Sequence, residues 1–389
     1  MFTSIDLFAG AGGLSEGFHQ AGFQVLAAND FDHWSAETFR TVHPETVFLE
    51  GPIQDFTPQD FLKKAGIKKG ELTCLAGGPP CQAFSVYNHQ RGMHDSRSGL
   101  FREYLRIVEG INPHWVVMEN VTGMTSVANG LAIKEIEKGL KSLGYSTFEY
   151  RILHSESFGV PQERRRIIFI ANRDRIPIHW PSGKYDGVFK RFTTIWEAIG
   201  DLPTLENGQG TEIQAYSIPL KECSDFQRRV RNGCQYVYNH VAPVLSNINL
   251  QRMKHIPQGG SWRDIPQNLL PAGMKRAKRS DHTKRYGRLC TEGLSSTILT
   301  KCDIHWGCYI HPFQNRTITV REAARLQSFP DKFIFQGPRT EQYRQVGNAV
   351  PPLLAKAVAE SILKILTSKD KMPNNKNSIN QSVEISQSV

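Results

Sequence analysis

The sequence lacks the features of a membrane protein or of a disulfide-stabilised secreted protein. No apolar run reaches the roughly 18 residues that a membrane-spanning helix needs. The opening residues, MFTSIDLF, lead into a strand-like run without the basic segment, apolar stretch and cleavage site of a signal peptide. The seven cysteines are an odd and scattered set, which argues against a disulfide framework. We therefore expect a cytoplasmic protein without a membrane anchor.

The sequence also lacks a zinc-finger pattern and an excess of acidic residues. Cys302, His305 and Cys308 are close together, but no fourth ligand follows at finger spacing, so we expect no metal site. Lysine and arginine number 47 against 37 aspartate and glutamate residues, a formal net charge of +10. This surplus favours a polyanionic partner without identifying it.

Short apolar runs alternate with helix-like segments over the first half of the chain. The strand candidates are TSIDLF (3–8), QVLAAN (24–29), TVFL (46–49), LTCLAG (72–77), HWVVME (114–119), STFEYRIL (146–153) and RRIIFIAN (165–172). Helix-like stretches such as LSEGFHQAG and SAETFRTV lie between the earlier runs. This alternation is typical of a parallel α/β sheet with helices on both faces. We expect the last two runs to close the sheet as a hairpin.

The alternation ends near Arg175, and a chain of 389 residues is long enough for two lobes. Proline, glycine, asparagine and basic residues then become frequent, and the periodicity is weak. Further on, VREAARLQSF (320–329) and PPLLAKAVAESILKIL (351–366) are predicted helices. The predicted division is an α/β domain over 1–178, an irregular domain over 179–320, a helical return over 321–366 and a disordered polar tail over 367–389.

A glycine-rich turn in DLFAGAGGLSEGF (6–18) separates the first strand from the first helix. Ligands of open α/β sheets bind at such strand ends, where Asp30 and Phe31 also follow the second strand. The carboxylate can bind ribose hydroxyls, and the ring can stack on a base. The turn lacks the third glycine of G-x-G-x-x-G, and Glu16 is poorly placed for phosphates. S-adenosylmethionine is therefore favoured over a nicotinamide dinucleotide, with a purely structural turn as the alternative.

A thiol, a carboxylate and two arginines are expected at the same edge of the sheet. Cys81 follows the fourth strand in GGPPCQAFS, where two prolines stiffen the approach. Glu119 lies in MENV at the end of the fifth strand. Arg164 and Arg166 alternate in QERRR, so in an extended chain they can point the same way. A thiol held beside a cofactor favours covalent catalysis, although a single cysteine at a strand end is more often structural.

Taken together, these residues resemble the DNA cytosine-5 methyltransferases of bacterial restriction-modification systems. DLFAGAGGLSEGF, GGPPCQAFS, MENV, QERRR and QVGNAVPP occur in the family's order, and VREAARLQSFPDKF is similar to the motif before its last helix. The resemblance covers the chain almost end to end. It implies a Rossmann-like sheet of the S-adenosylmethionine-dependent methyltransferase type, with a smaller and irregular target-recognition domain.

The resemblance implies a catalytic role for four residues. Cys81 matches the cysteine that attacks C6 of a flipped cytosine, and Glu119 matches the acid at N3. Arg166 matches the arginine at O2 and Arg164 a second arginine, although these two roles can be exchanged. The cofactor positions implied are Phe8, Ala9, Gly10, Gly12, Gly13, Leu14, Asp30, Phe31, Ile53, Asn348 and Val350. Pro52 stands where the family often has an aspartate near the adenine amino group, which leaves that contact open, with Asp55 as a substitute.

Two polar segments are expected to meet DNA. SVYNHQRGMHDSRSG (85–99) resembles the family's mobile loop, which closes over the flipped base. MKRAKRSDHTKRYGR (274–288) holds seven lysines and arginines against one aspartate, which suits phosphate contacts, with a solvated loop as the alternative. The predicted DNA contacts are Ser85, Arg97, Lys275, Arg276, Lys278, Arg279, Lys284 and Arg285.

The sequence thus predicts a monomeric enzyme that methylates cytosine C5 in duplex DNA, with S-adenosylmethionine as donor and a covalent Cys81 adduct. We expect it to be the modification enzyme of a type II restriction-modification system. A cognate restriction endonuclease would act on the same sequence without stable binding. A tRNA cytosine-5 methyltransferase and an inactive DNA-binding relative are the alternatives. The large irregular domain disfavours the first, and the intact catalytic set disfavours the second.

Overall fold

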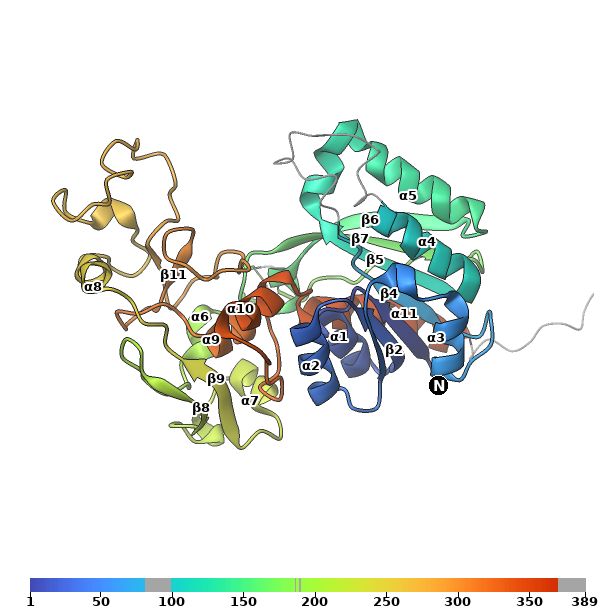
Figure 1. Ribbon diagram of the computed structural model, residues 1–389, viewed down its shortest axis with the longest axis horizontal. Coiled ribbons are helices and arrows are strands. Elements are labelled where there is room, and N and C mark those ends of the chain that lie inside the picture. The colour runs from blue at the N-terminus through green and yellow to red at the C-terminus, as the bar shows by residue number, and fades with distance from the viewer. Residues whose placement is uncertain (81–98, 186, 189, 370–389) are drawn as a thin grey trace, which may run out of the picture.

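The computed structural model describes residues 1–80, 99–185, 187–188 and 190–369 (Figure 1). Two lobes lie side by side along the long axis, one built on a sheet and one made of short elements and long loops. The six cysteines in the described residues are free thiols. No helix in this part of the chain is long and apolar enough to cross a membrane.

A seven-stranded sheet forms the centre of the first lobe, in the order β3-β2-β1-β4-β5-β7-β6. Its strands are β1 (Thr3–Leu7), β2 (Gln24–Asp30), β3 (Val47–Glu50), β4 (Cys74–Gly77), β5 (Trp115–Val121), β6 (Thr147–His154) and β7 (Arg165–Asn172). β1 to β5 pair in parallel, and β7 runs antiparallel between β5 and β6. β7 is buried along most of its length and takes the interior place, whereas the more polar β6 forms the edge. The predicted α/β class and the closing hairpin are confirmed.

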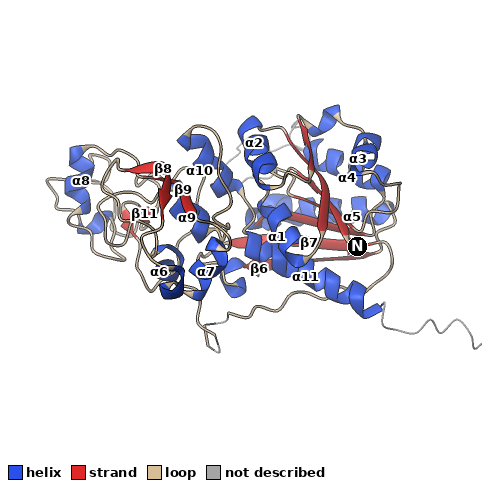
Figure 2. Ribbon diagram, turned by 90° about the horizontal axis from the view of Figure 1, so that it is seen from below, coloured by secondary structure: helices blue, strands red, loops and turns tan. Residues whose placement is uncertain are grey.

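Helices cover both faces of this sheet (Figure 2). They are α1 (Gly13–Ala21), α2 (His33–Val42), α3 (Pro58–Ala65), α4 (Gly99–Ile111), α5 (Leu131–Ser142) and α11 (Pro352–Lys369). Met118 of β5 packs in one core cluster with α3, α4 and α5, and its neighbour Val117 packs in another with α1 and α11. A Cβ at Gly17 would lie 2.3 Å from the Cβ of Ala355, so glycine permits the close approach of α1 and α11. α11 continues to Lys369, so residues 367–369 are helical and not part of a disordered tail; residues 370–389 lie outside the described residues.

The second lobe is built from short elements, as its weak periodicity predicts. They are α6 (Ile195–Ile199), β8 (Gly210–Ala215), α7 (Asp225–Arg231), β9 (Tyr236–Val241), α8 (Asn247–Met253), β10 (Gly287–Arg288), β11 (Cys308–Ile310), α9 (Val320–Leu326) and α10 (Arg339–Asn348). Across the two lobes, single turns of 3-10 helix lie at Ile53–Asp55, Ser155–Phe158, Leu220–Glu222 and Trp262–Asp264, with a longer run at Thr122–Gly130. β8 and β9 form an antiparallel hairpin, and β10 and β11 a short parallel pair.

Helices from both sides of the predicted boundary at residue 320 share one core. α6 and α7 pack in the same apolar cluster as α9. Within this core, Arg325 donates to Asp331 Oδ2 at 2.6 Å and to Asp201 Oδ2 at 3.3 Å, and all three side chains are buried. A buried guanidinium held by two carboxylates ties the helical return to the irregular lobe. The predicted domain boundaries stay predictions.

Candidate active site

The carboxylate of Asp30 holds the glycine-rich turn at the carboxyl end of the sheet. Its Oδ2 accepts a hydrogen bond from the backbone N–H of Gly10 at 2.8 Å, and its Oδ1 accepts one from the N–H of Asp32 at 2.9 Å. Burial raises the pKa of Asp30, and these backbone hydrogen bonds oppose the shift. The residue predicted to bind a ribose therefore also joins the ends of β1 and β2.

The turn itself requires glycine for steric reasons. A Cβ at Gly13 would lie 2.4 Å from the carbonyl oxygen of Val350, and one at Gly12 would lie 2.9 Å from the Phe39 ring. Gly12 also has a φ of 93°, in the left-handed region. Phe8 has a φ of 58°, which is uncommon outside glycine and is often found at functional sites. The C-terminal segment GNAV (347–350) thus packs directly on the turn.

The remaining residues near the turn differ in accessibility. Phe31 is 68% exposed and free to stack on a flat ring. Asn348, at the end of α10, is exposed, whereas Ala9 and Leu14 are buried. The accessible apolar surface here therefore comes from Phe31.

Ile53 offers little surface to a ligand, because it is only 2% exposed and packs into the sheet core. Its carbonyl oxygen accepts a hydrogen bond from Arg106 Nη2 at 3.1 Å. Pro52 and Asp55 flank it and are exposed. The predicted contacts of Ile53 and Asp55 with adenine stay predictions.

Asp6 lies beneath the turn, where the sequence analysis assigned it no role. Ser15 donates its hydroxyl to Asp6 Oδ2 at 2.6 Å, while Oδ1 is buried without a hydrogen-bond partner among the described residues. Burial raises the pKa of Asp6 to about 7, against the hydrogen bond from Ser15 and with help from the nearby charge of Asp30. Only the position of Asp6 near the end of β1 could have signalled this.

Glu119 and Arg166 form an ion pair across β5 and β7. Arg166 Nε lies 2.7 Å from Glu119 Oε1, and each side chain is 12% exposed. Burial raises the pKa of Glu119, while the charges of Arg166 and Arg164 and the hydrogen bond from Arg166 oppose the shift. A carboxyl group of this kind is oriented by the arginine and can hold a proton above its usual range.

The segment that leads to Cys81 passes against this pair. A Cβ at Gly78 would lie 3.1 Å from Glu119 Oε2. Asn120, the residue after Glu119, donates its side-chain amide to the carbonyl of Pro79 at 2.9 Å. Asn120 is thus a supporting residue that the sequence analysis missed. Three predicted site residues, Cys81, Ser85 and Arg97, lie outside the described residues.

Arg164 is placed differently from Arg166. Its Nη1 donates to the carbonyl of Ile298 at 3.2 Å, and its Nη2 donates to those of Gly347 and Ala349, both at 2.9 Å. The side chain is buried, and no ion pair joins it to Glu119 within the described structure. Arg164 therefore ties the irregular lobe and the GNAV segment to the start of β7. The contacts favour a positioning role, and its catalytic role stays a prediction.

Comparison with known proteins decides the family of this site. The sequence model of one protein family, the C-5 cytosine-specific DNA methylases, matches residues 2–364. The chain belongs to this family. Type II methyltransferase M.DdeI of Desulfomicrobium norvegicum is 35% identical over 379 residues, covering 92% of this chain and 88% of that protein. Type II methyltransferase M1.HphI of Haemophilus parahaemolyticus is 33% identical, covering 94% and 88%. The predicted enzyme class, a DNA cytosine-5 methyltransferase, is confirmed.

Solved structures agree on the fold. A prophage-encoded Escherichia coli protein described as a DNA modification methyltransferase superposes with a TM-score of 0.74 at 23% identity, covering 94% of this chain and 100% of that one. The Schizosaccharomyces pombe Dnmt2 methyltransferase gives a TM-score of 0.56 at 17% identity, covering 95% and 99%. At these identities the likeness shows the fold alone.

The cations in the segment predicted to contact DNA (274–288) differ in their exposure. Most are exposed, namely Lys275, Arg276, Lys278, Arg279 and Lys284. Arg285 is half-buried, with its guanidinium 5.1 Å from the ring centre of Trp306, which is 63% exposed. Lys284 Nζ lies 3.7 Å from Glu163 Oε2, so the segment reaches the start of β7 beside the site. Trp306 was missed by the sequence analysis, although an aromatic residue in the polar loop DIHWG was a possible signal.

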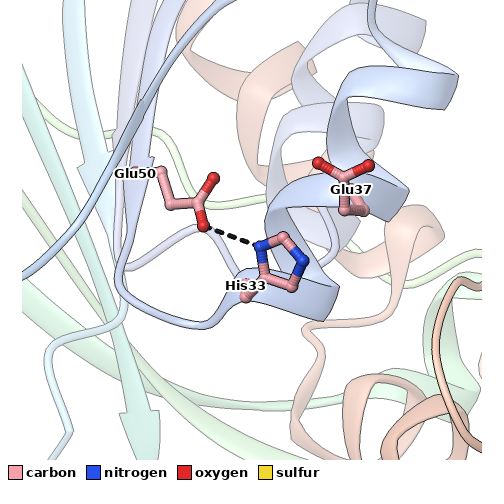
Figure 3. Close-up of side chains that lie close together, drawn as sticks. All are labelled: His33, Glu37 and Glu50. Atoms are coloured by element: carbon pink, nitrogen blue, oxygen red, sulfur yellow. Dashed lines mark hydrogen bonds and ion pairs between the residues drawn. The ribbon is translucent and has the colours of Figure 1, made fainter.

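One group of side chains in the methyltransferase lies close enough together to hold a metal ion, but an arginine side chain already pairs with its carboxylates. His33, Glu37 and Glu50 lie together at the exposed side of α2 (Figure 3). His33 Nδ1 lies 2.9 Å from Glu50 Oε1. Arg40 Nη1 lies 3.0 Å from Glu37 Oε1 and 2.7 Å from Glu50 Oε2. Arg40 therefore pairs with both carboxylates, and the cluster is best described as a surface ion-pair group.

Proposed function

We propose that the enzyme transfers a methyl group from S-adenosylmethionine to C5 of a cytosine flipped out of duplex DNA, through a transient bond between Cys81 and C6. The observation that carries this proposal is the Glu119–Arg166 pair, 2.7 Å apart, beside the segment that leads to Cys81. An oriented acid and a glycine-rich turn lie at one edge of the sheet, and the chain leads from this edge toward Cys81. This arrangement supports the proposed reaction and few others.

The proposed role of each residue follows from the chemistry of the ring. Cys81 adds as a thiolate to C6, and Glu119 gives a proton to N3 as electron density moves there. C5 then becomes nucleophilic enough to take the methyl group. Loss of the C5 proton to water, return of the N3 proton to Glu119 and elimination of the thiolate then restore the aromatic ring. Arg166 would hold Glu119 in place and contact the base O2, while Arg164 positions β7.

The residues of the turn fit S-adenosylmethionine. That donor supplies an electrophilic methyl group when it is bound. Asp30, buried at the strand end, would bind the ribose, and the exposed ring of Phe31 would stack on adenine. At Gly10 no atom lies within 4 Å of the place that a Cβ would take, so a ligand can approach this backbone closely, whereas Phe39 and Val350 occupy the space beside Gly12 and Gly13. Glu16 is buried in the first turn of α1, and a carboxylate there is poorly suited to a pyrophosphate.

We propose that duplex DNA contacts the second lobe. The exposed cations Lys275, Arg276, Lys278, Arg279 and Lys284 would contact phosphates without reading sequence. Arg285 is held on the Trp306 ring, so its planar guanidinium is pre-ordered for hydrogen bonding to a base edge. A flipped cytosine is required because C6 is not accessible inside a duplex.

We further propose that the enzyme is the modification partner of a type II restriction endonuclease, which would act on the same sequence without stable binding. The names of the type II relatives support this role. A monomeric state and a cytoplasmic location are proposed with it. Sizing chromatography of the purified protein with light scattering checks the first, and cell fractionation checks the second.

The test is methyl transfer from labelled S-adenosylmethionine to two substrates, unmethylated plasmid DNA and total tRNA. We expect label in the DNA as 5-methylcytosine and none in the tRNA. Cys81→Ser should lose transfer while retaining binding of the methyl donor. Label in tRNA without label in DNA would overturn the proposed substrate. Equal turnover by Cys81→Ser would overturn the covalent route.

A further inference from the structure

A second cleft lies outside the candidate active site, at the junction of the two lobes. It has a volume of roughly 390 Å³, within the range of small-ligand sites. Its walls are the loop that follows β7, α7 from the irregular lobe, and α11 from the sheet lobe. Figure 2 shows α7 and α11 on the same side of the molecule. None of the residues assigned above to the cofactor, the catalytic set or the DNA contacts lines this cleft.

One face of α11 lines the cleft. Lys356, Glu360 and Lys364 are spaced four residues apart, so they form a single stripe along the helix. The opposite face, which includes Leu354 and Ile362, is buried against the sheet and α1. The stripe is therefore not used by the core and faces the loop and α7.

The charge of the lining is strongly positive. Five cations line it, Lys184, Lys190, Arg229, Lys356 and Lys364, and the one acid among the lining residues is Glu360, giving +5 − 1 = +4. Glu360 lies 3.8 Å from Lys356, and its single charge offsets one of the five cations. Like charges gathered around one cavity repel one another, and an anion in the cleft would relieve that repulsion.

Tyr185 lies among these cations. Lys190 Nζ is 4.3 Å from the centre of its ring, and both Lys190 and Arg229 hydrogen bond to its phenol oxygen. Burial raises the pKa of Tyr185, but these two hydrogen bonds and the two positive charges outweigh it and lower the pKa. Tyr185 thus lies in a positively charged part of the cleft.

Two aromatic rings at the cleft, those of Tyr185 and Trp180, are already engaged, which restricts the ligand. The Tyr185 ring contacts Lys190 and packs close to Gly159, where a Cβ would lie 2.9 Å from a ring carbon. Arg151 covers a face of Trp180 at 5.2 Å, and the indole nitrogen of Trp180 donates to Glu149 at 2.7 Å. These two rings therefore offer little surface to a stacked base, whereas the ammonium and guanidinium groups of the lining suit a phosphate.

We propose that this cleft binds a phosphate group, supplied either by a small phosphate-bearing anion or by the DNA backbone beyond the target site. Arg229 and Tyr185 would hold the phosphate from one side, and Lys356 and Lys364 from α11 would hold it from the other. Because α7 and α11 belong to different lobes, a bound phosphate bridges the lobes. The inference is independent of the proposed catalytic roles.

The test uses the full-length double variant Arg229→Ala, Lys364→Ala, with Lys63→Ala, Lys64→Ala on the exposed side of α3 as a control of equal charge change. Calorimetric titration with inorganic phosphate and with pyrophosphate tests the small anion. We expect binding to wild type and control, and at least about tenfold weaker binding to the double variant, as for the loss of charge-assisted contacts.

The second arm measures binding to duplex DNA of about one and a half and about four helical turns across a range of salt. If the backbone is the ligand, the double variant lowers the logarithmic salt slope by about 2 for the long duplex alone. Methyl transfer at low salt should be unchanged in either case, which separates this inference from the catalytic proposal. Equal phosphate binding and equal slopes for the double variant and wild type would overturn it. Lys190→Gln, tested in the same way, guards against a folding defect in the double variant.

Discussion

Arg166 Nε lies 2.7 Å from Glu119 Oε1 across the antiparallel pairing of β5 and β7. Unlike the parallel pairing of β5 with β4, this antiparallel pairing sets the beginning of β7 against the end of β5. Since β7 enters the sheet where β5 leaves it, the arginine reaches the glutamate from the neighbouring strand. The position of β7 beside β5 therefore brings Arg166 to the carboxyl group of Glu119.

Glu119→Gln should lower kcat strongly, by about 10² to 10⁴, because an amide cannot give a proton to N3. The substitution is nearly isosteric, so the affinity for the methyl donor should change little. Single-turnover methyl transfer and a donor-binding titration measure the two effects. Comparable kcat values for variant and wild type would contradict the acid role.

Arg166→Ala should shift the fall of kcat at alkaline pH to a higher pH. Burial raises the pKa of Glu119, and Arg166 opposes that shift by its charge and its hydrogen bond. Without the arginine, the pKa rises further and the carboxyl keeps its proton to higher pH, although kcat falls because the acid is less well oriented. The pH dependence of single-turnover rates measures the shift. A fall that stays in place or moves to lower pH contradicts the coupling.

Asp6→Asn should remove a pH dependence from folding stability. Burial raises the folded-state pKa of Asp6 from 3.8 to about 7. The stability that protonation contributes is complete below the unfolded-state value and is lost as pH rises to about 7, at up to about 1.4 kcal/mol per pH unit. Urea denaturation at pH 5 and pH 8 should show the variant gaining on wild type at the higher pH. Asp55→Asn, at an exposed position, is the control, and parallel behaviour of Asp6→Asn and wild type would refute the assignment.

Arg285→Ala should change which sequences are methylated, whereas Lys278→Ala should weaken DNA binding uniformly. Arg285 is held over Trp306 and is ordered enough to read a base, at about 1–3 kcal/mol of discrimination. Lys278 is exposed and suited to a phosphate, and its removal should reduce the salt slope by about 1. Base-resolution methylation maps and salt titrations of both variants separate the roles. Unchanged specificity of Arg285→Ala would remove it as a reader.

Local sequence patterns were sufficient for much of this architecture. The strand that ends at Asp30 and the one that holds Glu119 follow from apolar runs, and the glycines between β1 and α1 follow from the turn that they form. The order of the strands in the sheet could not be predicted from their order in the chain, because β7 lies between β5 and β6. This position reflects the more apolar character of β7, which is buried on both faces.

Long-range contacts were beyond the reach of such patterns. Arg164 binds carbonyls of Ile298 and Gly347, which lie 134 and 183 positions away. The stacking of Arg285 on Trp306 and the gathering of cations from α7 and α11 likewise depend on how distant segments pack. No local periodicity encodes these contacts, so the sequence could suggest the arginines but not the groups that they bind.

The most direct test of the account is a genome-wide map of 5-methylcytosine in a host without cytosine methylation. Wild type and Cys81→Ser are expressed at equal soluble levels, and the DNA is sequenced at base resolution. The account predicts methylation at one short motif with wild type and none with Cys81→Ser. Absence of 5-methylcytosine from soluble wild type, or methylation that persists with Cys81→Ser, would contradict it.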